Sequence, residues 1–333
     1  MKVGRVFRRL TGLIAAASQA LIVSVTCLAA GEKAYHIPPT DRHSLTSRYV
    51  DQTYQIDVSM PISHIGGDEK FPVLYVTDGN LWSDALSVMG TLMQGMGEVE
   101  RFILVKVGYP SKNILAGAKL RGRDLVSPLA RHYLDKGMSE LNHSKAPSES
   151  LLGGALPYKK ATPSTSGKEF VQFIQNELMP FIDQRYPTVV GDNNYFGYSA
   201  GGGFGVYVLF SQPDLFKRYI LGSPAIGYNG RAFGLEQAKD FVSAGKSLTA
   251  KVYLSLGELE GYSLDLAPFD IAGNYYAFSR YLKQADIPGL ELHLKVFPQE
   301  THNTAWMSAY VHGVKTLFGK AACLPWMQPN TCP

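Results

Sequence analysis

The 333-residue sequence predicts an α/β fold with a mostly parallel central sheet flanked by helices. Nearly continuous apolar segments at 71–76 and 102–107 are typical of strands that helices cover on both faces. Helical patterns separate these segments from later strand candidates at 195–196, 218–221, 251–256 and 290–296. Because strand and helix alternate along most of the chain, we expect one large domain over residues 46–320.

The start of that domain has a different pattern. Residues 31–45 form an irregular entry segment that contains Pro38 and Pro39. Residues 54–58 (YQIDV) then alternate polar and apolar side chains with a period of two. This alternation predicts an edge or antiparallel strand, with one face in the core.

One helix has clear sequence signals. Residues 166–169 (SGKE) match a capping box. Phe170, Ile174 and Leu178 follow at four-residue spacing and predict one apolar stripe. Pro180 is expected to end or bend this helix near its last turn.

A long segment between the predicted strands has weak periodicity. Residues 110–165 are rich in Gly, Pro, Ser and Lys. Connections of this length in compact domains are usually functional. We therefore expect an insertion over the ends of the strands, with a lid as its candidate role.

The first thirty residues have the pattern of a secretory signal peptide. Four basic residues stand within the first nine, an apolar stretch runs to Ala30, and small residues at Ala29 and Ala30 suit cleavage. Export to the periplasm or the medium is expected. The alternative is an uncleaved membrane anchor, since about 20 apolar residues span a bilayer. No second apolar stretch has that length, so we expect no membrane association once the leader is removed.

Charge and cysteine usage agree with export. The chain carries a formal charge of +4, and residues 1–30 hold four positive and no negative charges, so the remainder is neutral. This gives no electrostatic basis for binding nucleic acid. Cys323 and Cys332 remain in a tail over residues 321–333. An oxidising compartment favours a disulfide between them, and two free thiols are the alternative.

Residues 197–201 (GYSAG) carry the main catalytic signal, the G-x-S-x-G spacing. An apolar strand precedes the motif and a helical pattern follows it, as a nucleophile on a sharp strand-to-helix turn requires. Side chains at 197 or 201 would crowd such a turn. Ser199 is the candidate nucleophile, and the amide of Ala200 is a candidate oxyanion donor. The alternative is a tight turn with an idle serine.

A serine nucleophile needs a base and an oriented acid. His302 follows the last predicted strand, which is where such a base stands, whereas His293 and His312 lie within a strand and a helix pattern. Glu260 follows the strand at 251–256 and is the first candidate for the acid, with Glu258 second. Asp265 and Asp270 are more distant options.

Other residues are candidates for contacts around the reaction. The amide of Asn80, after the strand at 71–76, could complete an oxyanion hole, or residues 77–80 could be a plain turn capped by Asp78. Arg123 could bind an acidic or polyphenolic group, or pair with Asp124 to hold the long loop.

Two aromatic residues complete the candidates for substrate contact. Tyr198 precedes the serine. Trp306 follows the histidine by four residues and could line the pocket or pack in the core.

Metal and nucleotide sites are not indicated. The sequence has no H-x-x-x-H, C-x-x-C or G-x-x-x-x-G-K-[ST] spacing. No cofactor and no metal are therefore expected.

Taken together, these motifs resemble the putative esterase family of α/β-hydrolases, which includes esterase D-like enzymes and siderophore esterases that open enterobactin-type trilactones. The resemblance covers about residues 46–318. It rests on segments 73–80 (VLYVTDGN), 123–128 (RDLVSP), 196–202 (FGYSAGG), 222–224 (GSP), 257–260 (GELE) and 300–302 (ETH). It implies the α/β-hydrolase fold, and it assigns Ser199, His302 and Glu260 as nucleophile, base and acid.

The expected function is hydrolysis of a small-molecule carboxylic ester through an acyl-enzyme on Ser199. By the resemblance, the substrate could be a siderophore ester or an acylated sugar. The alternatives are an acyltransferase that uses the same acyl-enzyme, or a non-catalytic binding protein on a hydrolase scaffold.

Overall fold

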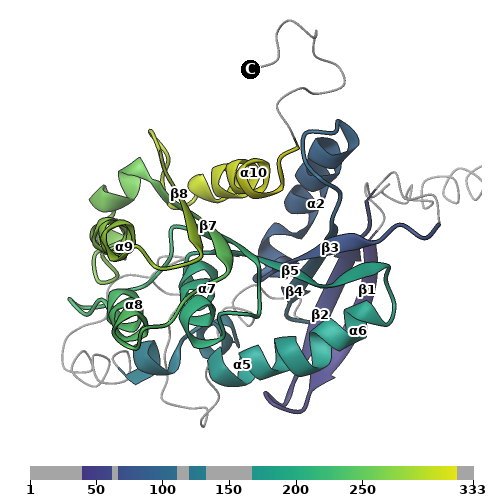
Figure 1. The fold of residues 1–333 in the computed structure, drawn as a ribbon, viewed down its shortest axis with the longest axis horizontal. Coiled ribbons are helices and arrows are strands. Elements are labelled where there is room, and N and C mark those ends of the chain that lie inside the picture. The colour runs from purple at the N-terminus through teal and green to yellow at the C-terminus, as the bar shows by residue number, and fades with distance from the viewer. Residues whose placement is uncertain (1–39, 62–66, 111–119, 133–166, 321–333) are drawn as a thin grey trace, which may run out of the picture. The chain divides into compact units, whose positions relative to one another are not determined.

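The computed structural model describes residues 40–61, 67–110, 120–132 and 167–320 (Figure 1). The predicted leader, most of the predicted insertion and the tail with Cys323 and Cys332 lie outside the described residues. Within the part described, no helix is both long and apolar enough to cross a membrane.

Eight strands form a single sheet in the order β1-β2-β4-β3-β5-β6-β7-β8. They are β1 (Thr40–Ser47), β2 (Gln52–Ser59), β3 (Phe71–Val76), β4 (Ile103–Gly108), β5 (Thr188–Tyr198), β6 (Arg218–Gly222), β7 (Ala250–Gly257) and β8 (Leu290–Phe297). The β1–β2 and β2–β4 pairs are antiparallel, and all the other neighbours are parallel. The mostly parallel sheet predicted from the sequence is confirmed, and the alternating segment at 54–58 lies in antiparallel β2.

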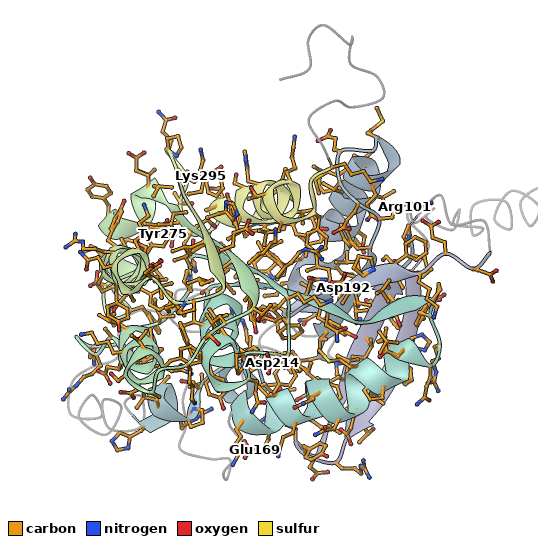
Figure 2. The ribbon with its side chains drawn as sticks, in the orientation of Figure 1. Arg101, Glu169, Asp192, Asp214, Tyr275 and Lys295 are labelled. Atoms are coloured by element: carbon orange, nitrogen blue, oxygen red, sulfur yellow. The ribbon has the colours of Figure 1, made fainter. Side chains whose placement is uncertain are left out.

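Helices cover both faces of this sheet (Figure 1). One face carries α2 (Gly79–Gly95) and α10 (Ala305–Phe318). The other carries α5 (Gly167–Phe173), α6 (Met179–Asp183), α7 (Ala200–Ser211), α8 (Phe233–Ser243) and α9 (Ile271–Ala285). Figure 2 shows side chains filling both spaces between helices and sheet. Every residue of β3 and β4 is therefore buried, which explains why their sequences are almost continuously apolar.

The predicted amphipathic helix begins with α5 and continues to the end of α6. Phe170, Ile174 and Leu178 are all buried, which confirms the apolar stripe. A π-helical turn at Ile174–Leu178 (η1) comes just before Pro180, and the helix ends at Asp183. Because proline has no N–H to donate, a local change of hydrogen-bond register lets the helix pass it before ending.

A buried lysine ties the first strands to α2. Lys106 in β4 is 1% exposed, and its Nζ donates to Ser59 Oγ at 3.0 Å and to Ser87 Oγ at 2.5 Å. A Cβ at Gly79 would lie 2.9 Å from the carbonyl carbon of Lys106, so the start of α2 rests directly on β4. Burial lowers the pKa of Lys106 to about 8.

This pKa predicts how stability changes with pH. The lysine pKa is 10.5 without burial, so between pH 8 and 10.5 the unfolded chain binds more protons than the folded chain. The free energy of unfolding should therefore rise with pH across that window, by about 3 kcal/mol. Urea unfolding of the wild type and of Lys106→Met at pH 7.5 and pH 10 measures this contribution as the difference between the two proteins. A difference that is the same at both pH values contradicts the prediction.

Candidate active site

The turn between β5 and α7 holds Ser199 in an unusual backbone conformation. Its φ of 58° and ψ of −116° lie outside the regions that non-glycine residues prefer, and such strain collects at functional sites. A Cβ at Gly197 would come within 2.3 Å of the Gly201 carbonyl oxygen, and a Cβ at Gly201 within 2.5 Å of Thr77 Oγ1. The requirement for glycine at both positions is confirmed.

Two further side chains form a hydrogen-bonded chain with Ser199. His302 Nε2 lies 2.9 Å from Ser199 Oγ, and His302 Nδ1 lies 2.7 Å from Glu260 Oε2. Glu260 is 3% exposed and His302 is 8% exposed, so water screens their interaction weakly. A carboxylate accepts from Nδ1–H, which leaves Nε2 unprotonated and able to take the serine proton.

The two glutamates of the loop after β7 have different surroundings. Glu258 is exposed, and its Oε2 accepts a hydrogen bond from the backbone N–H of Gln299 at 2.9 Å. Glu260 points inward to His302. The more distant candidates serve elsewhere: Asp270 accepts from Gly273 N–H at the start of α9, and Asp265 is exposed. Of these acids, Glu260 is the one that the fold brings to the histidine.

The Glu260 carboxylate accepts hydrogen bonds from two groups for which no role was predicted from the sequence. Its Oε1 accepts from Ser223 Oγ at 2.5 Å and from Gly257 N–H at 2.9 Å. Ser223 follows β6 with a φ of 42° and is 1% exposed. The 222–224 motif was the available signal, because a serine directly after a buried parallel strand faces the edge where sites form. These bonds fix the orientation of the carboxylate and, through it, of the imidazole.

Tyr198 is not placed to contact substrate, which corrects the expectation from the sequence. Its side chain is 2% exposed, and its hydroxyl donates to the His302 carbonyl oxygen at 2.9 Å. The hydroxyl is also 3.4 Å from Glu260 Oε1. As the last residue of β5, Tyr198 points into the layer beneath α2 and α10, whereas the turn at Ser199 directs the serine outward.

Trp306 packs against the core, which was the alternative to lining the pocket. Its ring stacks on Trp82, with centroids 4.6 Å apart and planes 28° from parallel. The pair joins α10 to α2 within the core cluster on that face of the sheet. The side chain is partly buried, and it is not among the described residues that line the hollow beside α7.

The predicted oxyanion donors lie in the first turns of two helices. Asn80 N–H belongs to the start of α2, and Ala200 N–H to the start of α7. Amides in a first helical turn have no partner within their helix, and they lie at its positive end. The 77–80 loop approaches the serine turn closely, since Thr77 Oγ1 would collide with any Cβ at Gly201. The Asp78 side chain accepts no capping hydrogen bond from the backbone of α2, which leaves the plain capped turn without support.

Arg123 pairs with Asp124, which is one of the two roles that the sequence left open for it. It pairs with Asp124 through Nε at 2.6 Å and Nη2 at 3.0 Å. Asp124 is 1% exposed and also accepts hydrogen bonds from Tyr54 and Tyr109 at 2.7 and 3.1 Å. These bonds hold the 120–132 segment against β2 and β4, the alternative that the sequence left open.

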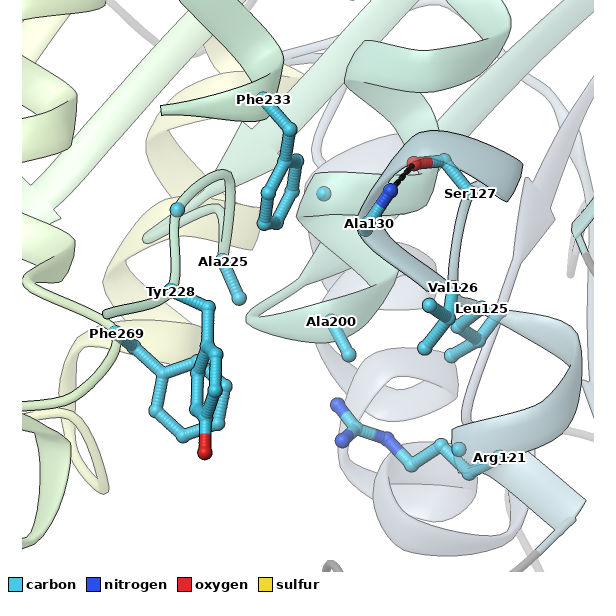
Figure 3. Close-up of a pocket in the computed structure, with 13 residues that line it drawn as sticks. Arg121, Leu125, Val126, Ser127, Ala130, Ala200, Ala225, Tyr228, Phe233 and Phe269 are labelled. Atoms are coloured by element: carbon cyan, nitrogen blue, oxygen red, sulfur yellow. Dashed lines mark hydrogen bonds between the residues drawn. The ribbon is translucent and has the colours of Figure 1, made fainter. Parts of the chain in front are cut away.

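Arg121, two residues earlier, is the arginine at the site. Its Nε donates to Asp78 Oδ1 at 2.7 Å, and its side chain remains 21% exposed. Figure 3 shows its guanidinium beside Ala200. No role was predicted for Arg121 from the sequence, although it lies only two residues from Arg123.

A hollow opens beside the start of α7 (Figure 3). Tyr228, Phe233 and Phe269 form one wall, and residues 121–130 form the other. Among the residues that the structure describes, no cluster of three or more His, Cys, Asp or Glu side chains could hold a metal ion.

Comparisons with known proteins point to one family. A family model described as "Putative esterase" matches residues 136–314. The ferri-bacillibactin esterase BesA of Bacillus subtilis (strain 168) is 31% identical over 234 residues, which cover 68% of this chain and 73% of that protein. The siderophore enterobactin esterase of Emericella nidulans is 29% identical over 223 residues, which cover 64% and 67%.

Solved structures agree on the fold. The BES protein from Bacillus cereus superposes with a TM-score of 0.66 at 22% identity, covering 86% of this chain and 97% of that one. The siderophore hydrolase EstB from Aspergillus nidulans gives 0.67 at 21% identity, covering 86% and 98%.

The two glutamates after β7 give a direct test of the site. Glu260→Ala should lower kcat for a simple ester by roughly 10²- to 10⁴-fold, because the imidazole loses its orientation and charge partner. Glu258→Ala, on the same loop, is the matched control and should stay near wild type. Ser223→Ala should lower kcat about tenfold with little change in KM, as expected for a lost hydrogen bond to a buried charge. Equal effects of the two glutamate variants would contradict the assignment.

Proposed function

This chain belongs to the Putative esterase family, has the α/β-hydrolase fold and is a carboxylic ester hydrolase, and on that premise we propose that it cleaves siderophore esters through an acyl-enzyme on Ser199. The observation that carries the mechanism is the hydrogen-bonded chain from Ser199 through His302 to Glu260. The substrate class is supported by the names of the relatives, which are esterases of bacillibactin, enterobactin and triacetylfusarinine C. Neither acyl transfer nor non-catalytic binding is favoured by these relatives.

The geometry supports a two-step mechanism. Ser199 Oγ attacks the ester carbonyl carbon and its proton passes to His302 Nε2. The amides of Ala200 and Asn80 stabilise the oxyanion, each contributing about 3 kcal/mol. As the carbon–oxygen bond breaks, His302 gives the proton to the leaving alcohol. Water then attacks the carbonyl carbon of the acyl-enzyme and gives a proton to His302. As the bond between this carbon and Ser199 Oγ breaks, His302 returns the proton to Ser199 Oγ and the acid is released.

The buried position of Glu260 supports its role in this cycle. When His302 holds a proton, the nearby carboxylate stabilises the positive charge. Two donors already satisfy Oε1, so Oε2 remains directed at Nδ1. The imidazole can therefore change its protonation state without rotating.

Hydrolysis by purified protein beginning at residue 31 tests this function. The wild type should hydrolyse p-nitrophenyl acetate and release acid from bacillibactin or enterobactin, and Ser199→Ala should lose both activities by at least about 10³-fold. Mass spectrometry of the products distinguishes hydrolysis from transfer to an added alcohol. A fluorophosphonate probe should label the wild type but not the variant.

The outcomes of this experiment test the reaction and the choice of substrate independently. Ser199-dependent cleavage of p-nitrophenyl acetate without cleavage of either bacillibactin or enterobactin would overturn the siderophore proposal and leave the esterase intact. Undiminished activity in Ser199→Ala would overturn the assignment of the nucleophile.

We also propose that residues 1–30 are a cleaved leader, that the enzyme acts in the periplasm or the medium, and that Cys323 and Cys332 form a disulfide. The basic, apolar and small-residue pattern of the leader supports export, and an oxidising compartment favours the disulfide. The intact mass of the exported protein should correspond to cleavage near Ala29 or Ala30. Thiol titration in denaturant should find no free thiol, and a full-length mass with three free thiols would contradict both expectations.

A further inference from the structure

Strand β8 forms one of the two edges of the sheet. It pairs with β7 from Leu290 to Phe297 in continuous parallel register, without a bulge. Among the residues that the structure describes, none pairs with its outer side. Figure 1 shows α9 on one side of this strand and α10 on the other. A long, regular edge strand presents a row of N–H and C=O groups with which another strand can pair.

The bonds between β7 and β8 show which backbone groups of β8 face outward. The N–H of Ala250 donates to the Gly289 carbonyl oxygen at 3.2 Å, so the backbone groups of residue 289 point toward β7. This direction alternates along a strand. The N–H and C=O groups of residues 290, 292, 294 and 296 therefore point away from β7, toward the open edge.

One face of β8 carries aliphatic side chains that are only partly buried. These are Leu290, Leu292, Leu294 and Val296. Their counterparts in β7, which has a strand on each side, are fully buried: Ala250, Val252, Leu254 and Leu256. The opposite edge of the sheet, β1, is mostly polar instead. A further strand beside β8 would remove more of this aliphatic surface from water, which favours association.

The other face of β8 carries charges arranged evenly around His293. Glu291 lies two residues before the histidine and Lys295 two residues after it. Glu291 pairs within the chain with Lys251 and His293, both at 2.9 Å. Lys295 is exposed and forms no ion pair with any residue in the described part of the chain. This pattern is complementary to itself when a second copy of the strand runs antiparallel, because Glu291 of each copy then lies opposite Lys295 of the other.

The same register also satisfies the backbone. With His293 on the twofold axis, residue 292 lies opposite residue 294, and residue 290 opposite residue 296. Each outward-pointing residue then meets another, and the two exchange both N–H···O bonds. A slip by one residue would lose these bonds. A slip by two residues would place His293 opposite Glu291 or Lys295, so the two Glu291–Lys295 pairs would be lost.

We propose that β8 is a homodimer interface, in which two copies of this chain pair antiparallel about His293 and join their sheets into one continuous sheet. A second copy is the occupant because the charge pattern and the backbone register are both self-complementary. The parallel parts of the two sheets then run in opposite directions. The edges that carry Ser199 and His302 therefore face opposite ways, and the rate of ester hydrolysis should be the same in monomer and dimer.

Charge reversal on β8 tests the interface. Sedimentation velocity of the protein, expressed as the full chain and purified, should show a monomer–dimer equilibrium. Lys295→Glu and Glu291→Lys should each weaken dimerisation about tenfold or more, because like charges then lie opposite each other at two places. An equimolar mixture of the two variants should form a heterodimer about as tightly as the wild type, since opposite charges then face each other at both places.

The matched control is Lys70→Glu. Lys70 is exposed and precedes β3, which β5, β6 and β7 separate from β8. This variant should dimerise like the wild type, and all variants should retain the wild-type rate with p-nitrophenyl acetate, which verifies their folding. A wild type that stays monomeric at every concentration overturns the proposal. So does a dimer that both reversals leave intact, or a mixture of active variants that stays monomeric.

Crosslinking tests the register directly. Residue 293 lies opposite itself in a pair whose Cα atoms are about 4.5 Å apart, within the range of a disulfide. Mild oxidation of His293→Cys should therefore yield a covalent dimer that dithiothreitol dissociates. Lys295→Cys is the control, because the two copies of residue 295 lie at least about 13 Å apart along the strands. The wild type shows any crosslink through Cys323 or Cys332. Equal crosslinking of the two variants overturns the register centred on His293.

Discussion

The left-handed turn at Ser199 is the constraint on which the rest of the site depends. A φ of 58° at a non-glycine residue costs about 1–3 kcal/mol, so the surroundings must impose it. Hydrogen bonds do so on both sides: Ser199 N–H donates to the Gly222 carbonyl oxygen, and its own carbonyl oxygen accepts from Gly203 and Ala225, all at 2.9 Å. These bonds connect β5, β6 and α7. The same turn directs the hydroxyl toward the histidine and sends the preceding Tyr198 into the core, and that is why adjacent residues have opposite roles.

Burial of Glu260 imposes a second requirement, because an isolated carboxylate in a core is very unfavourable. Its two oxygens accept from Ser223 Oγ, Gly257 N–H and His302 Nδ1, at 2.5 to 2.9 Å. The donors come from the ends of β6, β7 and β8. Parallel strands bring their carboxyl ends to one edge of a sheet, so residues far apart in the sequence meet there. The polar network and the sheet topology therefore depend on each other.

Two arginines in one short segment have different roles because they pair with different carboxylates. Arg123 pairs with Asp124, which Tyr54 and Tyr109 also bind, and so holds the segment against the sheet. Arg121 pairs with Asp78, at the start of the oxyanion loop, and keeps part of its guanidinium at the hollow. The contact links the loop that would stabilise the oxyanion to the 120–132 segment.

The sheet, the serine turn and the order of the candidate triad could be predicted from the sequence, because each is a local pattern: apolar strands, glycines flanking Ser199, and acids and histidines after particular strands. The sequence left Glu260 and Glu258 open, since both stand on one loop and only packing decides which carboxylate is buried beside His302. It misjudged Tyr198 and gave Ser223 no role, because the direction of a side chain at a strand end depends on the turn that follows. Tertiary structure decided these points, since hydrogen bonding and burial are settled between segments that lie far apart in the chain.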